Sequence, residues 1–474
     1  MRRSLILLAA AAAVAAGVSS RPTLAQQPAA PDEALVARAR AIHEKVIALD
    51  THDDINASNF TAERNYTQDL NTQVNLPKMF KGGLDASFFI VYVGQNRGPD
   101  AFTKEAFDNA YKQASEKFDA IHRLTKEIAP DRIELALTPA DVRRIAAAGR
   151  KVALIGVENG YPLGDESTAI ARVKEFQARG ARYLSLAHNG HSQLADSNTG
   201  EADGVWLHKG LSPLGKQVIA ELNRVGIMVD ISHPSKEANL QAIALSKAPV
   251  IASHSAARAM FDHSRNLDDE QLLALKKNGG VVQTVAFAGY VKVNRPSAER
   301  TAALEKLADD YKVPVTALGR GGRGRGAGRG AGAGGGRAGQ AAAAGGRTTA
   351  GAAGAQGQGR GSNPLAALSE EQRAELQKRL EELNTKFPPP PRANVKDFVD
   401  HIDYIVTKIG LDHVGISSDF DGGGGVEGWN DASETFNVTL ELVRRGYTEE
   451  QIGKIWSGNL LRVMEQAQKV AEKR

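Results

Sequence analysis

Four apolar stretches of the sequence are each followed at once by acidic or histidine residues. The first leads into the segment DTHDD, in which His52 and Asp54 are two residues apart. Side chains at that spacing project from the same side of an extended chain, so this pair can chelate a metal ion. The other three stretches lead to Glu158, His233 and His254. Histidine and carboxylate ligands without cysteine favour borderline-hard divalent ions, zinc first, with manganese and cobalt as alternatives.

Each of these residues also has an ordinary structural interpretation. A His-x-Asp pair taken alone is usually made of turn residues, and a single buried histidine is more often structural than a ligand. The repetition of the same residue types at four strand ends favours a metal site. Because a carboxylate such as Glu158 can bridge two ions, and five ligand-type side chains exceed what one catalytic zinc usually takes, the sequence predicts two ions per chain.

Two further polar residues follow predicted strands and are not needed as ligands. An acid that faces a metal-activated water can collect its proton and pass it to the leaving amine, which makes Asp419 a catalytic candidate. His188 can stabilise a developing oxyanion. The structural alternative for Asp419 is that it is an ordinary acidic residue of a glycine-containing turn. Ser253 and Ser255 flank His254 but lack the Gly-x-Ser-x-Gly turn of a serine hydrolase, so no serine nucleophile is predicted.

Alternating strand and helix patterns must position these residues. Short apolar runs bounded by turn residues predict eight strands, mostly separated by amphipathic helical patterns such as 168–179 and 214–224. This alternation predicts parallel βαβ units, and eight of them favour an α/β fold closed into a (β/α)8 barrel, with an open doubly wound sheet as the competing architecture. The carboxyl ends of the strands then form the active-site face. The predicted strands are Val46–Asp50, Ala86–Val93, Val152–Val157, Tyr183–Ala187, Ile227–Ile231, Val250–Ser253, Val281–Ala286 and Val414–Ser417.

One segment does not follow this pattern. Residues 319–361 contain 19 glycines and seven arginines among 43 residues and no acidic residue, so the net charge of +4 originates there. The segment lacks apolar residues to offset chain entropy, which predicts a disordered Gly/Ala/Arg-rich insertion. It divides the barrel into residues 26–318 and 393–474, with a helix at 369–386 and a proline-rich linker within 362–392. No Phe or Tyr is interspersed among the glycines, so nucleic acid is not an expected partner.

The N-terminus predicts export of the chain. Residues 1–25 combine Arg2 and Arg3, an apolar run and a small-residue cleavage site before Gln26, as in a secretory signal peptide. The apolar run is shorter than the roughly 20 residues of a spanning helix, so no stable membrane anchor is expected after cleavage. The chain has no cysteine, which excludes disulfides, thiolate ligands and a cysteine nucleophile. A periplasmic or secreted protein is therefore predicted.

The sequence resembles the membrane dipeptidases, also called renal dipeptidase-like or M19 metallopeptidases. The resemblance runs from about Ile47 to Met464 and is interrupted by the glycine-rich segment. Departures are small: the segment after Arg265 lacks a proline often seen there, and GISSDFDG has serines where glycines are usual. The matching pieces, in chain order, are DTHDD, LPKMFKGGLDASFFIVYV, GVENG, LSLAHNGHSQLADS, GIMVDISHPS, PVIASHSAARAM, HSRNLDDEQL, HVGISSDFDG and GNLLRVME.

This resemblance implies a TIM-like barrel of the metal-dependent hydrolase type and a zinc-dependent dipeptidase. The enzyme would cleave dipeptides with a free C-terminal carboxylate through a hydroxide that bridges two zinc ions, and it would form a homodimer. Metal ligation is implied for His52 and Asp54 at one zinc, Glu158 as the bridge, and His233 and His254 at the second. Asp419 is the implied proton-transferring acid, His188 contacts the substrate and its oxyanion, Arg265 clamps the substrate carboxylate, and Tyr290 is a further predicted substrate-binding residue.

Other functions remain open at this level. Another binuclear metal-dependent amidohydrolase, acting on a cyclic amide or a lactone, would share the His-x-Asp start, although no lysine lies at a predicted strand end to form a carbamylated bridge. A noncatalytic binding protein is the alternative from a different class. For Arg265, the alternative is a surface ion pair with Asp268 or Asp269.

Overall fold

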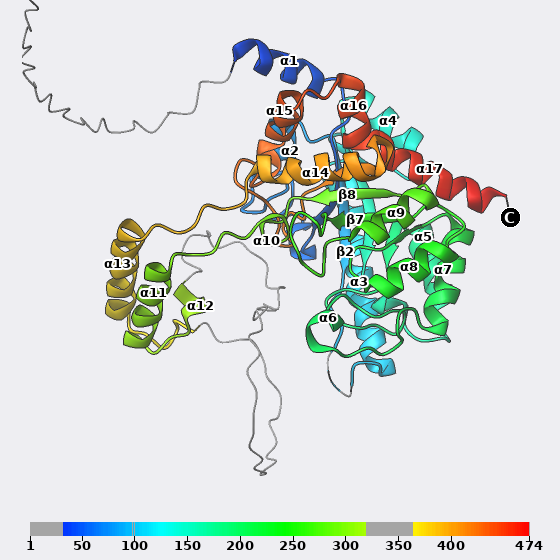
Figure 1. The fold of residues 1–474 in the computed structure, drawn as a ribbon. Coiled ribbons are helices and arrows are strands. Elements are labelled where there is room, and N and C mark those ends of the chain that lie inside the picture. Colours follow the sequence, from blue (N-terminus) through cyan, green and yellow to red (C-terminus); the bar gives the residue numbers. More distant parts are fainter. Residues whose placement is uncertain (1–31, 97, 99, 319–363, 474) are drawn as a thin grey trace, which may run out of the picture.

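Eight parallel strands form a barrel in the computed structural model, which describes residues 32–96, 98, 100–318 and 364–473 (Figure 1). The predicted signal peptide, 1–25, and the predicted insertion, 319–361, therefore lie outside the described residues. The barrel strands run in sequence order, which confirms the predicted (β/α)8 architecture. They are β1 Leu49–Asp54, β2 Ala86–Tyr92, β4 Lys151–Glu158, β5 Ala181–Ser185, β6 Met228–Asp230, β7 Ile251–Ser255, β8 Val281–Val285 and β9 Val414–Ser417. The short strand β3, Ile133–Leu135, pairs with the start of β4 and was not predicted.

Closure of the barrel occurs between β1 and the segment after β9. The amide of Asp54 donates to the carbonyl of Phe420 at 2.8 Å, and Asp53 and Phe420 form a parallel bridge. The prediction that the first strand spans Val46–Asp50 is wrong in its bounds, because β1 continues through Asp54. Its polar residues do not end the strand because neighbouring strands supply partners for them: Asp53 accepts hydrogen bonds from Ser87 and Ser418.

Apolar side chains pack together at the N-terminal end of the barrel. A buried cluster combines residues at or next to the first position of six strands with residues of the C-terminal helix α17, Asn459–Glu472. Alternating strand residues that point inward fill such a barrel with side chains, so this end is a packed core. The polar strand ends therefore lie at the opposite, C-terminal face. The strand residues of this cluster include Leu49, Ala86, Val152, Met228, Ile251 and Val281, and α17 contributes Leu460, Leu461, Val463, Met464 and Ala467.

Helices follow most strands, and several of them begin at a residue whose side chain caps the helix, as at α7 and α8. The predicted helix 214–224 is α7, Pro213–Val225, where Ser212 caps the N-terminus and Gly226 ends the helix with a φ of 77°. Among the described residues, no helix has both the length and the apolar character needed to cross a bilayer. The other helices before α11 are α1 Glu33–His43, α2 Leu76–Gly82, α3 Lys104–Arg123, α4 Pro139–Ala147, α5 Ala169–Ala178, α6 Gly200–Asp203, α8 Lys236–Leu245, α9 Asp269–Asn278 and α10 Ala288–Val291.

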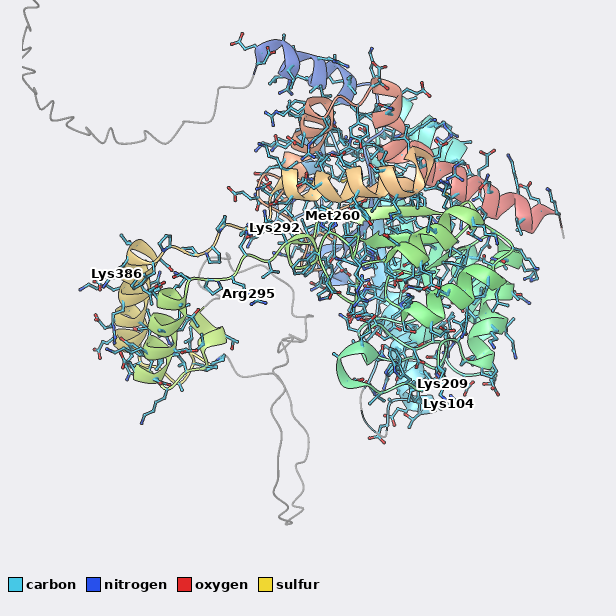
Figure 2. The ribbon with its side chains drawn as sticks, in the orientation of Figure 1. Lys104, Lys209, Met260, Lys292, Arg295 and Lys386 are labelled. Atoms are coloured by element: carbon cyan, nitrogen blue, oxygen red, sulfur yellow. The ribbon has the colours of Figure 1, made fainter. Side chains whose placement is uncertain are left out.

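Three helices form a small unit of their own beside the barrel (Figure 1). Helices α11, Ala298–Asp310, α12, Val315–Leu318, and α13, Glu370–Lys386, share a separate apolar core that includes Leu307 and Leu376. Figure 2 places Lys292 and Arg295 along the connection from the barrel and Lys386 at the end of α13. The remaining helices, α14 Val395–Ile409, α15 Phe436–Arg444 and α16 Glu449–Gly453, return to the barrel with α17.

Candidate active site

All five predicted metal ligands converge at the C-terminal ends of the barrel strands. His52 and Asp54 belong to β1, Glu158 ends β4, His233 follows β6, and His254 lies in β7. Ligand atoms of the first three lie within 4.8 Å of one another, and so do those of Glu158, His233 and His254. Glu158 is therefore common to two adjacent groups, each able to hold a metal ion.

The two carboxylate oxygens of Glu158 face different histidines. Oε1 lies 2.7 Å from His233 Nε2 and 3.3 Å from His254 Nε2, whereas Oε2 lies 3.6 Å from His52 Nε2. The chain turns directly after this residue, where Asn159 adopts a left-handed φ of 73° and its side chain donates to the carbonyl of Val93 at 2.9 Å. A buried carboxylate held between two sets of imidazoles has the geometry of a bridge.

The ring of His52 is oriented by a tyrosine in the barrel interior. Tyr183 donates to the carbonyl of Thr51 at 2.9 Å, so its oxygen accepts the hydrogen on His52 Nδ1, which lies 3.0 Å away. This arrangement places a proton on Nδ1, so Nε2 is the nitrogen that faces Glu158 and could bind a metal ion. Within the described structure, Nε2 is buried and has no hydrogen-bond partner.

A serine and an aspartate orient the ring of His254 in the same way. Ser253 Oγ donates to Asp230 Oδ2 at 2.7 Å and lies 2.8 Å from His254 Nδ1, which fixes the proton on that nitrogen. His254 Nε2 then lies 2.9 Å from His233 Nε2. Two imidazole nitrogens at this separation repel each other unless a cation or a shared proton lies between them.

The pKa shifts give an ionised Glu158 and neutral His233 and His254, as metal ligands require, whereas His52 is protonated. Burial opposes ionisation of Glu158, but His188 and His52 hold the pKa of its carboxyl group well below the usual range. Burial lowers the pKa of His233 and His254 well below the ordinary value, which keeps both rings neutral. Burial also acts downward on His52, yet the adjacent carboxylates raise its pKa to about 10. A metal ion would displace that proton, since only a neutral imidazole binds metal.

Asp419 lies beside this cluster, directly after β9. Its Oδ1 is 3.9 Å from His52 Nε2, and its backbone adopts a left-handed φ of 58°. Glycine is required nearby, because a Cβ at Gly422 would fall 2.3 Å from Asp54 Oδ2 and 2.4 Å from Asp419 Oδ1. Burial raises the pKa of Asp419 well above its usual value. Its carboxylate also forms a third possible ligand group with His52 and His254.

His188 lies at the edge of the cluster. Its Nε2 is 3.8 Å from Glu158 Oε1, and its ring centroid lies 4.2 Å from that of His233 and 4.6 Å from that of Tyr92. Ser197 Oγ donates to the carbonyl of His188, which ties the loop after β5 to the next segment. The ring is therefore held beside the ligands, where a substrate can contact it.

Arg265 also lies against the cluster and is 2% exposed. Its Nη2 lies 3.1 Å from His233 Nε2 and 3.2 Å from the carbonyl of His254. Its Nε and Nη1 are buried and have no hydrogen-bond partner among the described residues. The alternative surface ion pair is not found, because Asp268 pairs with Lys236 and Asp269 pairs with Lys408, each at 2.6 Å.

Tyr290 packs against the guanidinium of Arg265. The Arg265 Cζ lies 5.4 Å from the Tyr290 ring centroid, and Phe287 stacks on the same ring at 4.2 Å between centroids. Burial raises the pKa of the Tyr290 hydroxyl, so it stays a hydrogen-bond donor at neutral pH. The structure thus brings Arg265 and Tyr290, both predicted to bind substrate, into contact.

Three residues that orient the histidines were missed by the sequence analysis. Tyr183 and Asp230 sit in predicted strands, and Ser253 was considered only as a nucleophile. A tyrosine or aspartate inside an otherwise apolar strand is a signal of a buried polar contact. Which histidine it contacts depends on the register between strands, which a single sequence does not contain.

Comparison with known proteins identifies the family. The sequence model of the family described as membrane dipeptidase, peptidase family M19, matches residues 36–474. The chain belongs to this family. Among its M19 relatives, dipeptidase tcpJ of Claviceps purpurea is 28% identical over 406 residues, which cover 85% of this chain and 72% of that protein. Human dipeptidase 3 is 26% identical over 444 residues, which cover 92% of this chain and 68% of that protein. The chain is accordingly an enzyme of the metallodipeptidase class.

Solved structures of similar proteins have the same fold. The probable dipeptidase PvdM from Pseudomonas aeruginosa is 31% identical with a TM-score of 0.68, and the match covers 93% of this chain and all of PvdM. A metallo peptidase from Rhodobacter sphaeroides, liganded with a phosphinate mimic of the dipeptide L-Ala-D-Ala, is 19% identical with a TM-score of 0.59. That match covers 89% of this chain and 99% of the solved chain, and it shows the fold alone.

Proposed function

We propose that this M19 enzyme hydrolyses dipeptides with a free C-terminal carboxylate at a centre of two divalent ions, with zinc as the expected metal. The position of Glu158 carries this proposal. Its carboxylate lies between His52 on one side and His233 with His254 on the other. A single catalytic ion needs three protein ligands, whereas these side chains supply two groups joined by one acid.

The residues present fit bound metal ions. His52 Nε2 is a buried nitrogen without a hydrogen-bond partner in the described structure, and His233 Nε2 and His254 Nε2 converge to 2.9 Å. Both features are unfavourable in a purely hydrogen-bonded core and are relieved by cations. When bound, two divalent ions lower the pKa of a coordinated water toward neutrality and polarise a scissile carbonyl. Tyr183, Ser253 and Asp230 keep the ligand nitrogens deprotonated toward the ions.

Arg265 is proposed to bind the C-terminal carboxylate of the substrate. A buried guanidinium with Nε and Nη1 unpaired within the described chain has charged N–H donors available for a carboxylate. The contact with Tyr290 limits the orientations of the guanidinium. A substrate without this carboxylate would leave the two donors buried and unsatisfied.

Proton transfer is proposed for Asp419. Its raised pKa allows the buried carboxyl group to accept a proton from the attacking water and to hold it until the leaving amine takes it. His188, at the edge of the ligand cluster, is proposed to donate to the oxygen that becomes negative during attack. Both side chains lie close enough to Glu158 or His52 for one small substrate to touch them together.

Other properties are proposed on the family relationship and the sequence. The dipeptidase names of the relatives tcpJ and human dipeptidase 3 support a dipeptide as the substrate class here. The apolar run and cleavage site in residues 1–25 support export to the periplasm or secretion. A homodimer is proposed from the family resemblance.

A double comparison of substrate and enzyme tests the function. The enzyme and its Arg265→Leu variant are assayed on a free dipeptide and on the same dipeptide with an amidated C-terminus. Each single change is expected to lower kcat/KM by roughly 10-fold to 150-fold, the range for a charge-assisted contact, and the double change by little more. Arg265→Lys, which keeps the charge, serves as the control for folding. Fully additive losses would remove Arg265 from the substrate site, and activity only on cyclic amides or lactones would contradict a dipeptidase.

A further inference from the structure

Helix α3 carries a lysine on the face that it otherwise buries. Lys117 follows Ala110 by seven residues and Ala114 by three, and it precedes Ile121 by four, which places all four on one side of the helix. The other three are buried apolar residues. Lys117 is partly buried and interrupts this apolar stripe. Its position is therefore not that of an ordinary solvent-exposed surface lysine.

The ammonium lies at the rim of the candidate active site. Its Nζ is 5.6 Å from the centroid of the Tyr92 ring. Tyr92 is the last residue of β2 and pairs in register with Glu158 on β4, and its ring centroid is 4.6 Å from that of His188. Arg265 lies against His233 and His254 instead. Two cations therefore lie near the ligand cluster, Arg265 in contact with the histidine ligands and Lys117 over the Tyr92 ring.

Lys117 has no bound counter-charge in the described part of the chain, where it forms neither a hydrogen bond nor an ion pair. Burial lowers the pKa of its ammonium, and the carboxylates of Asp54 and Glu158 act in the opposite direction from a distance. Both acids are proposed metal ligands, so bound ions would neutralise them. A partly buried ammonium without a partner is unfavourable, and a mobile anion can supply one.

Space for such an anion exists beside the helical turn that precedes the lysine. A cavity of about 370 Å³ lies between α3 and the segment after β2. Its lining includes Gly94, Gln113 one turn before the lysine, and the opposite charges of Lys112 and Glu116. Gly94 lies close to Tyr92, because a Cβ at Gly94 would be 3.3 Å from Tyr92 Oη, so this part of the cavity wall is next to the residue that the ammonium faces. The cavity is polar, as a site for a charged side chain requires.

We propose that Lys117 selects dipeptides whose N-terminal residue is aspartate or glutamate, by pairing with the side-chain carboxylate. This inference rests on the proposed function, in which Arg265 takes the C-terminal carboxylate. With that end fixed beside His233, the N-terminal residue extends toward Asp54 and α3, and two residues span about 7 Å. A lysine ammonium is a compact cation that suits a single carboxylate there.

The test compares two substrates of nearly equal shape, Glu-Ala and Gln-Ala, on metal-loaded enzyme. The wild type is expected to prefer Glu-Ala in kcat/KM by roughly tenfold or more, the range for a charge-assisted contact. Lys117→Met should bring the ratio close to one, and Lys117→Arg should retain most of the preference. Lys126→Met is the matched control, because Lys126 is exposed on the helical turn after α3. It should keep the wild-type ratio.

Several outcomes would overturn this proposal. Equal wild-type rates on both substrates would do so. So would a Lys117→Met enzyme that loses the same factor on both substrates together with metal content, since the lysine would then only support the metal centre. If the metal-loaded wild type cleaved no dipeptide at all, the proposed function itself would fail. Cleavage of Gln-Ala and Glu-Ala at equal rates would overturn the selectivity alone.

Discussion

Two buried acids of the site, Glu158 and Asp419, differ in protonation because their neighbours differ. Glu158 is ionised despite burial because histidines surround it, whereas Asp419 is buried with fewer compensating charges and has a raised pKa. One carboxylate is thus suited to binding cations and the other to holding a proton, although both lie within reach of His52. Environments that shift the pKa values of neighbouring acids apart are typical of catalytic pairs.

Replacing Asp419 with asparagine tests this division. Asparagine keeps the size and the turn but cannot accept a proton, so kcat is expected to fall by roughly 10² to 10⁴. Metal content, measured by elemental analysis of the purified variant, should stay near the wild-type value. A rate close to wild type would show that another group transfers the proton. Loss of metal would indicate that Asp419 is a ligand, as its proximity to His52 and His254 allows.

Barrel strands act on the site by fixing the histidine rings. In β7, Ser253 and Ser255 flank His254 and differ in their contacts. Ser253 Oγ connects the histidine to Asp230, whereas Ser255 Oγ is buried without a partner among the described residues. Ser253 is therefore expected to orient His254, and Ser255 provides a control position in the same strand.

Ser253→Ala is expected to weaken metal affinity by about 10-fold to 100-fold, the usual effect of removing a group that orients a metal ligand. Ser255→Ala removes an equally buried hydroxyl from the same strand and should leave the affinity near wild type. Competition with a chelator, followed by zinc content, measures both variants. Equal losses in the two variants would show that packing of β7, and not the contact to His254, sets the affinity.

Strand-level patterns explain why the sequence predicted so much of this site. Hydrophobic runs located all eight barrel strands, because buried parallel strands are continuously apolar. The polar residues that end them, such as His233 and Glu158, were therefore placed correctly on one face. The bounds of β1 were missed because Asp53 is paired across strands with Ser87 and Ser418. Such pairings, and that of Tyr183 with His52, depend on register and on side-chain direction, which periodicity does not encode.

At the scale of the whole molecule, the packed apolar core and the candidate metal ligands lie at opposite ends of the barrel. Helix α17 closes the N-terminal end with apolar side chains, and the ligands lie at the C-terminal end. The α11–α13 unit stands beside the barrel with its own core, and it contributes none of the predicted site residues. The glycine-rich residues 319–361 lie between α12 and α13 in the sequence.

Replacing residues 319–361 with a short Gly/Ser linker is therefore expected to leave kcat/KM within about twofold of wild type. Loop-closure entropy changes slowly with loop length, so the free energy of unfolding should change by only about 1 kcal/mol. Steady-state kinetics and urea denaturation check both values. A collapse of activity in a folded variant would show that this segment takes part in substrate binding.

Counting metal ions per chain tests the central claim most directly. Purified, zinc-loaded enzyme should contain two ions per chain, and Glu158→Gln should lower both the metal content and the dipeptidase rate, because a neutral amide is a poor bridge. Glu166→Gln, at an exposed glutamate, is the matched control and should keep both ions and the rate. Full activity with a single ion per chain, or an unchanged metal content in Glu158→Gln, would contradict the two-metal centre.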